Sequence, residues 1–289
     1  MTRIITSLSK IAHDYDALFC DLWGCVHNGI EAFPEAVAAL RAFKETGGKV
    51  VLVTNSPRPR ANVAQQIAGM NVPDDCWDSI ATSGDSARAA LFEGAVGEKV
   101  YHIGIPEETA FFEPLKIIEN PAQIARVPLE DAEGIVCTGP RDPYEDPSVY
   151  RSEFLYAKQK GLKLLCANPD VIVDRGEKRE WCAGALAELY DEMGGESLYF
   201  GKPHPPIYDL ARRRLAQIAN IHDERILAIG DGPHTDLAGA VGEGIDSLFI
   251  TGGIAAQDTE TDGAPDEGKL IPYLDNIKLT PSYVIGKLR

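Results

Sequence analysis

The stretch that decides the fold is residues 17–25, which read Ala-Leu-Phe-Cys-Asp-Leu-Trp-Gly-Cys. Its apolar start, from Ala17 to Cys20, predicts a buried strand, and Asp21 followed by Gly24 predicts a tight loop where that strand ends. In parallel α/β sheets, small-molecule sites lie at the carboxyl edge of the strands. A single aspartate at a strand end is most often a turn or capping residue, so Asp21 gains weight only if reactive groups follow other strands too.

Three later apolar runs also end in reactive groups. These groups are Thr54 and Asn55 after residues 49–53, Lys202 after residues 198–200, and Asp231 and Asp236 after residues 225–229. If the strands are parallel neighbours, the carboxylates, the hydroxyl and the ammonium group converge on one small volume. Such a set of groups suits a divalent cation together with a phosphate.

In this order, the four segments resemble the four motifs of the haloacid dehalogenase (HAD) superfamily of phosphohydrolases. Further segments resemble its class IIA branch, which includes the NagD-like sugar and nucleotide phosphatases and the phosphoglycolate and pyridoxal phosphate phosphatases. They are Thr82-Ser83-Gly84, Tyr101-His102-Ile103-Gly104, Asn168-Pro169-Asp170 and Gly201-Lys202-Pro203. The resemblance covers nearly the whole chain and is specific as a set, although each motif alone is weak.

Strand and helix patterns alternate along the chain. Helical spacing in residues 34–45 and 60–70, between apolar runs, predicts an α/β fold with a doubly wound parallel sheet. A second alternating series starts beyond residues 94–97. The resemblance implies a Rossmann-like core of residues 1–96 and 181–289, with residues 97–180 inserted as an α/β cap of the C2 type. The cap is expected to end near residues 176–180, where a helix over 181–193 leads back into the core strand before Lys202. Residues 258–269 are expected to form a surface loop.

The resemblance also implies roles for the motif residues. Asp21 would attack phosphorus and form an aspartyl-phosphate, which water then hydrolyses. Lys202 would stabilise the charge that builds up on the transferring phosphoryl group. The hydroxyl of Thr54 and the backbone N–H of Asn55 would bind the phosphoryl oxygens.

The implied cofactor is Mg²⁺, which prefers about six oxygen ligands and keeps several waters. Asp21 and Asp231 would supply side-chain ligands, and the backbone carbonyl of Trp23 a third protein ligand. Asp236 would lie just outside the ligand set or pair with Lys202.

Trp23 departs from the family pattern, because family phosphatases usually carry a second aspartate two residues after the nucleophile. That aspartate protonates the leaving oxygen and later activates water, and an indole can do neither near neutral pH. General acid–base assistance is worth roughly 10²–10⁴-fold, so its loss should slow the enzyme without abolishing turnover.

Several explanations stay open. His27 could be a substitute acid, or the substrate could have a good leaving group, as acyl, enol and aryl phosphates do. The substrate or the cap could supply the acid, or the protein could bind a phosphorylated metabolite with little or no turnover. Phosphotransfer to an acceptor other than water is a further alternative.

The expected substrate is a small phosphate monoester, such as a sugar phosphate or related metabolite. Candidate substrate contacts are Arg58, Asn168 and Asp170. A solvated helix start explains Arg58 as well, and a turn explains the other two.

Bulk properties limit the partners. The 289 residues carry a net charge of −16, which argues against nucleic acid and anionic membranes. No apolar stretch approaches the roughly 20 residues that span a bilayer, and the first residues lack the pattern of a signal peptide. Six scattered cysteines without a Cys-x-x-Cys pair are expected to be core residues in a reducing compartment. We therefore expect a cytoplasmic protein, and a homodimer because caps of this branch often pair.

Overall fold

The computed structural model describes residues 2–115, 118–175 and 178–289 and divides into two compact units. The first unit contains residues 1–54, 64–81 and 208–289, and the second contains residues 55–63 and 82–207. Each unit has its own parallel sheet. The predicted end of the cap near residues 176–180 falls partly on residues 176 and 177, which lie outside the described residues.

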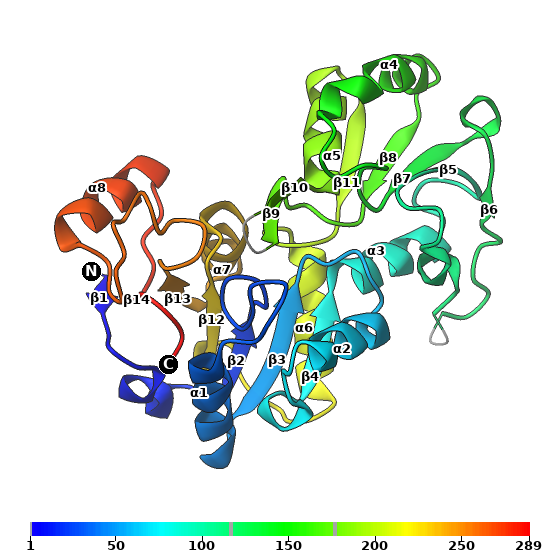
Figure 1. Ribbon diagram of the computed structural model, residues 1–289. Helices are drawn as coiled ribbons and strands as arrows, with labels where there is room; N and C mark the ends of the chain where they lie inside the picture. The colour runs from blue at the N-terminus through cyan, green and yellow to red at the C-terminus, as the bar shows by residue number, and fades with distance from the viewer. Residues whose placement is uncertain (1, 116–117, 176–177) are drawn as a thin grey trace. The chain divides into compact units, whose positions relative to one another are not determined.

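The first unit is built on a seven-stranded sheet (Figure 1). Its order is β1-β14-β13-β12-β2-β3-β4, and the registered pairs within it are parallel. The bounds are β1 (Arg3–Ile4), β2 (Ala17–Cys20), β3 (Lys49–Thr54), β4 (Ser79–Thr82), β12 (Ile226–Gly230), β13 (Asp246–Ile250) and β14 (Tyr283–Ile285). This arrangement confirms the predicted parallel-sheet α/β class.

The strand order reverses between β2 and β12. From β2 the chain continues to β3 and β4 on one side, whereas β12 continues to β13 and β14 on the other. Ile229 of β12 lies opposite Cys20 of β2. Ligands of open α/β sheets bind at this kind of switch point, beyond the carboxyl ends of the strands. A site is therefore expected at the residues that follow β2 and β12.

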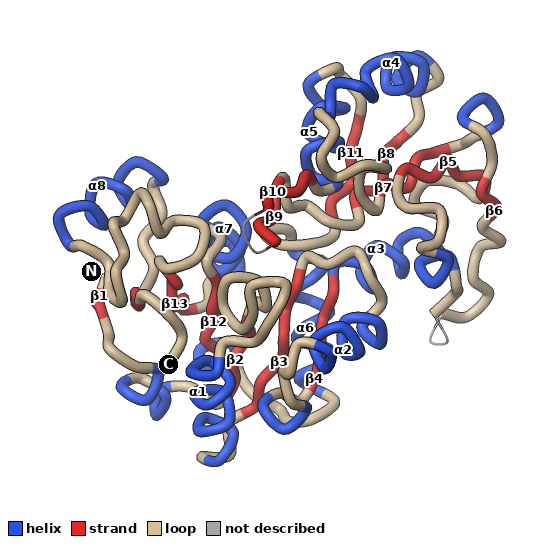
Figure 2. The backbone as a smooth tube through the Cα atoms, in the orientation of Figure 1, coloured by secondary structure: helices blue, strands red, loops and turns tan. Residues whose placement is uncertain are grey.

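Helices flank this sheet, as the tube representation shows (Figure 2). They are α1 (Pro34–Glu45), α2 (Arg60–Gly69), α6 (Pro205–Ala216), α7 (Ala238–Glu243) and α8 (Glu267–Ile277), of which α2 and α6 each cross from one unit to the other. Proline at the first position of α1 suits the helix start, and Ala36, Val37, Leu40 and Phe43 are buried at helical spacing. The helices predicted over 34–45 and 60–70 are therefore confirmed.

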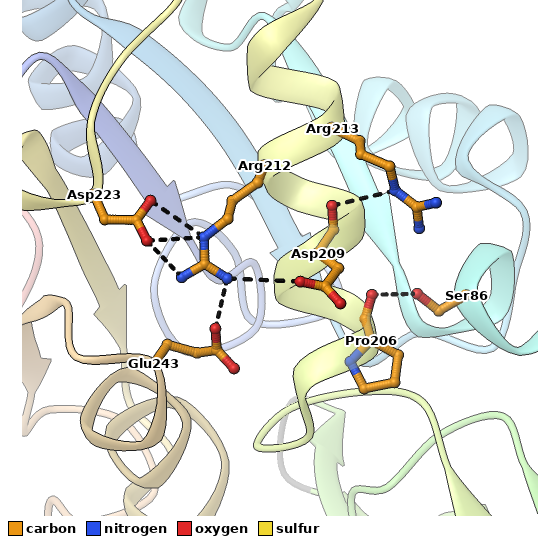
Figure 3. Close-up of polar contacts among 7 residues, drawn as sticks. All are labelled: Ser86, Pro206, Asp209, Arg212, Arg213, Asp223 and Glu243. Atoms are coloured by element: carbon orange, nitrogen blue, oxygen red, sulfur yellow. Dashed lines mark hydrogen bonds and ion pairs between the residues drawn. The ribbon is translucent and has the colours of Figure 1, made fainter.

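A charged cluster holds α6 in the first unit (Figure 3). Arg212 contacts Asp223 at 3.0 Å and Glu243 of α7 at 2.5 Å. One guanidinium thus ties α6 to the segment before β12 and to the helix after it.

The second unit contains a five-stranded parallel sheet in the order β11-β8-β7-β5-β6. Its strands are β5 (Lys99–Ile103), β6 (Ala125–Arg126), β7 (Gly134–Cys137), β8 (Lys163–Cys166) and β11 (Glu196–Tyr199), and β9 (Ile172–Arg175) pairs antiparallel with β10 (Lys178–Trp181). Its helices are α3 (Ser83–Phe92), α4 (Arg151–Gln159) and α5 (Ala183–Glu192).

Side chains of β7 alternate between two apolar clusters. Ile135 and Cys137 pack in the cluster that contains residues of α4 and α5, and Val136 packs in the cluster that contains residues of α3. This period of two is what a strand covered on both faces requires.

The strand expected at residues 198–200, before Lys202, was predicted to belong to the core sheet, and this prediction is wrong. It is β11, and it pairs with β8 in register from Glu196 to Tyr199. The preceding helix α5 buries Leu186 and Tyr190 in the second unit's cluster, and α3 buries Ala87 and Leu91 in the other cluster of that unit. The second unit therefore extends beyond the predicted range 97–180, because the apolar faces of α3 and α5 are buried there.

Shorter helical segments connect these elements: η1 (Leu8–Lys10), η2 (Ala12–Asp14), η3 (Asp74–Cys76), η4 (Thr109–Phe112), η5 (Leu129–Asp131), η6 (Pro147–Tyr150), η7 (Asp223–Arg225) and η8 (Pro233–Leu237). All six cysteines are buried, as predicted for core residues. Within the described ranges, every helix is too short or too polar to cross a bilayer.

Candidate active site

Asp21 and Asp231 lie side by side at the switch point of the first sheet. Each directly follows its strand, and the backbone N–H of Asp21 donates to the carbonyl of Ile229 at 2.8 Å, which extends the pairing of β2 with β12. The two aspartates are only 7% and 5% exposed. The predicted convergence of these two carboxylates is therefore present in the fold.

Backbone segments enclose the carboxylate of Asp231. A Cβ atom at Gly24 would lie 2.1 Å from its Oδ2, and one at Gly253 would lie 2.0 Å from the same atom. The N–H of Ile254 donates to this oxygen at 3.0 Å. Gly24 also has φ +69°, a conformation that other residues adopt only with strain. Glycine at both positions lets two loops approach Asp231 closely.

The carboxylates fit a hard divalent cation. A ligand oxygen of Asp21, one of Asp231 and the Sγ atom of Cys25 all lie within 4.8 Å of one another, and all three residues are buried. Burial, followed by the charges of the two aspartates, raises the pKa of the Cys25 thiol well above its ordinary value. Carboxylate oxygens are the ligands that Mg²⁺ and Ca²⁺ prefer. A cation here would also offset the repulsion between two neighbouring buried carboxylates.

Asp236 organises the turn that follows β12. Its Oδ2 accepts the N–H of Gly232 at 3.2 Å and the hydroxyl of Thr235 at 3.3 Å. A Cβ atom at Gly230 would lie 2.0 Å from its Cγ. This carboxylate therefore binds the backbone just after Asp231 and packs closely against the backbone just before it.

The loop after Asp21 folds back on itself around Trp23. The N–H groups of Val26 and His27 both donate to the carbonyl of Leu22, at 2.8 and 3.1 Å. The indole of Trp23 is partly buried, with its ring centre 5.2 Å from that of His27. A Cβ atom at Gly29 would lie 2.4 Å from the indole, so glycine is needed where the ring packs.

His27 is 1% exposed, and its Nδ1 accepts the N–H of Gly29 at 3.0 Å. The neutral ring in this arrangement carries its proton on Nε2. Any role of His27 as a substitute acid would therefore depend on Nε2.

Thr54 is the last residue of β3 and is buried in the first unit, whereas Asn55 begins the second. Within the second unit, the Asn55 side chain contacts two other predicted site residues. Its Oδ1 accepts the N–H of Lys202 at 2.7 Å, and its Nδ2 donates to the carbonyl of Lys202 at 3.1 Å and to Oδ1 of Asp170 at 2.8 Å. The fold thus brings Asn55, Asp170 and Lys202 together.

The other predicted substrate contacts lie in local turns of the second unit. Asn168 accepts the N–H of Asp170 through its Oδ1 at 3.0 Å, which is an Asx turn. Arg58 is exposed, and its backbone N–H donates to the Ser56 hydroxyl at 3.3 Å. These contacts account for the turns and leave both roles in substrate binding as predictions.

Polar residues also gather at the carboxyl ends of β5 and β7. His102 Nε2 lies 2.9 Å from the Thr138 hydroxyl, and burial lowers the pKa of His102 to about 4. Burial raises the pKa of Glu108, while a hydrogen bond with Thr138 and the charge of Arg58 oppose this change.

Sequence reasoning missed the part played by residues 252–254 around Asp231. The available signal was Gly252-Gly253, one residue beyond the apolar run 248–250, a pattern that marks a strand end with a close backbone approach.

Comparisons with known proteins agree with this architecture. A family model described as haloacid dehalogenase-like hydrolase matches residues 18–117, and a HAD-hydrolase-like model matches residues 199–277. A crystal structure of a haloacid dehalogenase-like hydrolase from Brucella suis 1330 is 38% identical, with a TM-score of 0.86 over 99% of this chain and 100% of that one.

Two phosphatases are similar to this chain at lower identity. Human glycerol-3-phosphate phosphatase is 25% identical over 91% of this chain and 89% of its own length. Glycerol phosphate phosphatase Rv1692 from Mycobacterium tuberculosis, in a complex with magnesium, is 22% identical, with a TM-score of 0.69 over 96% of this chain and 77% of that one.

Proposed function

The chain belongs to the haloacid dehalogenase-like hydrolases, and on that basis we propose that it is a Mg²⁺-dependent phosphatase of a small phosphate monoester, in the NagD-like class IIA branch. The observation that carries the proposal is the pair of buried carboxylates, Asp21 and Asp231, at the switch point of the parallel sheet. Related phosphatases with phosphorylated small-molecule substrates support the reaction class.

In this proposal Asp21 is the nucleophile. One of its carboxylate oxygens forms a bond to phosphorus while the bond from phosphorus to the alcohol oxygen breaks, and water then cleaves the aspartyl-phosphate. The hydroxyl of Thr54 and the backbone N–H of Asn55 bind phosphoryl oxygens, and the ammonium group of Lys202 stabilises their developing charge.

Asp21, Asp231 and the backbone carbonyl of Trp23 would hold Mg²⁺. The ion, when bound, supplies positive charge that offsets the repulsion between the nucleophile and the phosphate. Asp236 keeps Asp231 in place through the turn that it supports.

The substrate would be a sugar phosphate or a related metabolite, with Arg58, Asn168 and Asp170 as substrate contacts. We also propose a cytoplasmic location, because the thiols suit a reducing compartment, and a homodimer, because caps of this branch often pair. The excess of acidic residues disfavours nucleic acid as a partner.

The test measures phosphate release from p-nitrophenyl phosphate, acetyl phosphate and a panel of sugar phosphates, with Mg²⁺ and with excess EDTA. Asp21→Asn should lower turnover by on the order of 10³-fold or more, because the amide is a poor nucleophile. Asp16→Asn is the matched control. Asp16 precedes β2 at its opposite end and pairs with Arg225 at 2.9 Å, so this change should leave turnover intact.

Turnover that survives in Asp21→Asn would refute the assignment of Asp21 as the nucleophile. A wild type that binds phosphate and Mg²⁺ but releases nothing, while Trp23→Asp gains turnover, would favour the alternative, a catalytically weak or inactive protein that binds a phosphorylated metabolite. Accumulation of an aspartyl-phosphate would instead indicate transfer to an acceptor other than water.

A further inference from the structure

The side chain of Asn55 has a role separate from the phosphate contact assigned to its backbone. We propose that it is a positioning residue, which holds the backbone of Lys202 and the loop that carries Asp170 in one fixed arrangement. The inference rests on the proposed function, because it concerns the placement of the lysine that stabilises the phosphoryl group.

The hydrogen bonds of the Asn55 amide carry the argument. Its Oδ1 and Nδ2 bind both backbone groups of one residue, the N–H of Lys202 at 2.7 Å and its carbonyl at 3.1 Å. The second donor position of Nδ2 is used by Oδ1 of Asp170 at 2.8 Å. Asn55 and Lys202 are 2% and 3% exposed, so water has little access to replace these bonds. A primary amide is the side-chain group that donates twice and accepts in this way.

Close packing leaves this arrangement little freedom. A Cβ atom at Gly201 would lie 2.5 Å from Oδ1 of Asn55 and 2.6 Å from Cδ of Pro169. A Cβ atom at Gly184 would lie 2.2 Å from the carbonyl of Pro169 and 2.5 Å from that of Asp170. Glycine at position 201 lets its backbone approach the amide, and glycine at position 184 lets α5 approach the loop that carries Asp170.

Placement matters because the ammonium group acts over a short distance. A shift of about 1 Å in a group that stabilises a transition state can cost on the order of 10²-fold in rate. The Lys202 side chain starts from a backbone that Asn55 binds on both sides. Asn55 should therefore act on the reaction through Lys202, and the Asp170 contact should help to hold the amide in its orientation.

The experiment combines single and double variants. Asn55→Ala should lower kcat by about 10- to 100-fold and change KM much less, since the ammonium of Lys202 acts mainly in the transition state. In a Lys202→Ala background, Asn55→Ala should have almost no further effect, because the group it positions is gone. A purely structural role would instead lower activity by the same factor in both backgrounds.

Variants of Asp170 test the third contact. Asp170→Ala removes the acceptor and should lower kcat by about tenfold, whereas Asp170→Asn can still accept through its Oδ1 and should restore most of this loss. Asn55→Asp should behave like Asn55→Ala, since a carboxylate cannot donate to Lys202 or Asp170. Thermal unfolding of each variant shows whether the fold is retained.

A kcat for Asn55→Ala within about threefold of the wild type would overturn the inference. So would a double variant whose loss in kcat equals the product of the losses in Asn55→Ala and Lys202→Ala. If the wild type proves inert, the proposed function fails separately. Titration calorimetry with inorganic phosphate then tests the positioning: Asn55→Ala should weaken binding as much as Lys202→Ala does, and unchanged affinity would refute it.

Discussion

A methyl group at Gly24 would be placed directly against the carboxylate of Asp231. In Gly24→Ala the new Cβ atom would lie 2.1 Å from Oδ2 of Asp231, an oxygen that already accepts the N–H of Ile254. The carboxylate must rotate or move away, because this separation is far below van der Waals contact. Since Asp231 is a proposed metal ligand, the variant should bind Mg²⁺ more weakly.

Backbone strain is a second effect, and Gly244→Ala isolates it. Gly244 has φ +66°, close to the +69° of Gly24, and a Cβ atom there would meet nothing within 4 Å. A left-handed conformation costs a non-glycine residue roughly 1–2 kcal/mol, so both variants should lose about that much stability. For a folding unit of about 150 residues, this corresponds to a fall in Tm of about 2–8 °C.

Only the site contact should separate the two variants. Gly24→Ala should weaken Mg²⁺ binding by about 10- to 100-fold, the range seen when residues that orient a metal ligand are changed, and kcat/KM at low Mg²⁺ should fall in proportion. Gly244→Ala should keep the wild-type Mg²⁺ affinity. Calorimetric titration with Mg²⁺ measures both without relying on turnover. Equal Mg²⁺ affinities in the two variants would refute the metal site at Asp231.

Two further predictions concern protons. In the wild type, kcat/KM should fall steeply across aryl and alkyl phosphates as the leaving-group pKa rises. Trp23→Asp should flatten this dependence by raising kcat/KM for the poorest leaving groups by up to about 10²–10⁴-fold. Trp23→Asn is the matched control, and equal slopes in the two variants would contradict a missing acid. The pKa of His102 is about 4 in the folded state and about 6.5 in the unfolded state, so the unfolded state binds the proton at a higher pH. The free energy of unfolding should therefore drop as pH falls from about 6.5 to 4. Urea unfolding near pH 7 and near pH 5 should show a smaller drop for His102→Gln, and an identical drop would count against this assignment.

The local pattern of the chain was sufficient to predict most of the secondary structure. The helix α1 and the strands β2, β3 and β12 lie within a residue of their expected positions, because apolar periodicity and the glycines that end each run are local signals. Asp21 and Asp231 could be paired for a related reason: parallel neighbouring strands that both end in an acid must present those acids at the same edge.

The assignment of elements to a unit could not be predicted from the same pattern. The strand β11 and the helices α3 and α5 have the periodicity of any α/β segment, and nothing in that periodicity says which sheet they join. The choice depends on which apolar face fits against them, as Leu186 and Leu91 show by packing with strands of the second sheet. Packing complementarity is a property of the folded chain and is not encoded in hydrophobic spacing.

The candidate site residues could be named from the order of residue types along the chain, since each of them follows an apolar run. Tertiary structure decided what surrounds these groups: the glycine backbones around Asp231, the indole of Trp23 against Gly29, and the Asn55 amide on the backbone of Lys202. The contact between Asn55 and Lys202 alone joins residues 147 positions apart in the sequence. They arise only when the sheets assemble, because hydrogen bonds and van der Waals contacts act over a few ångströms in space and not along the sequence.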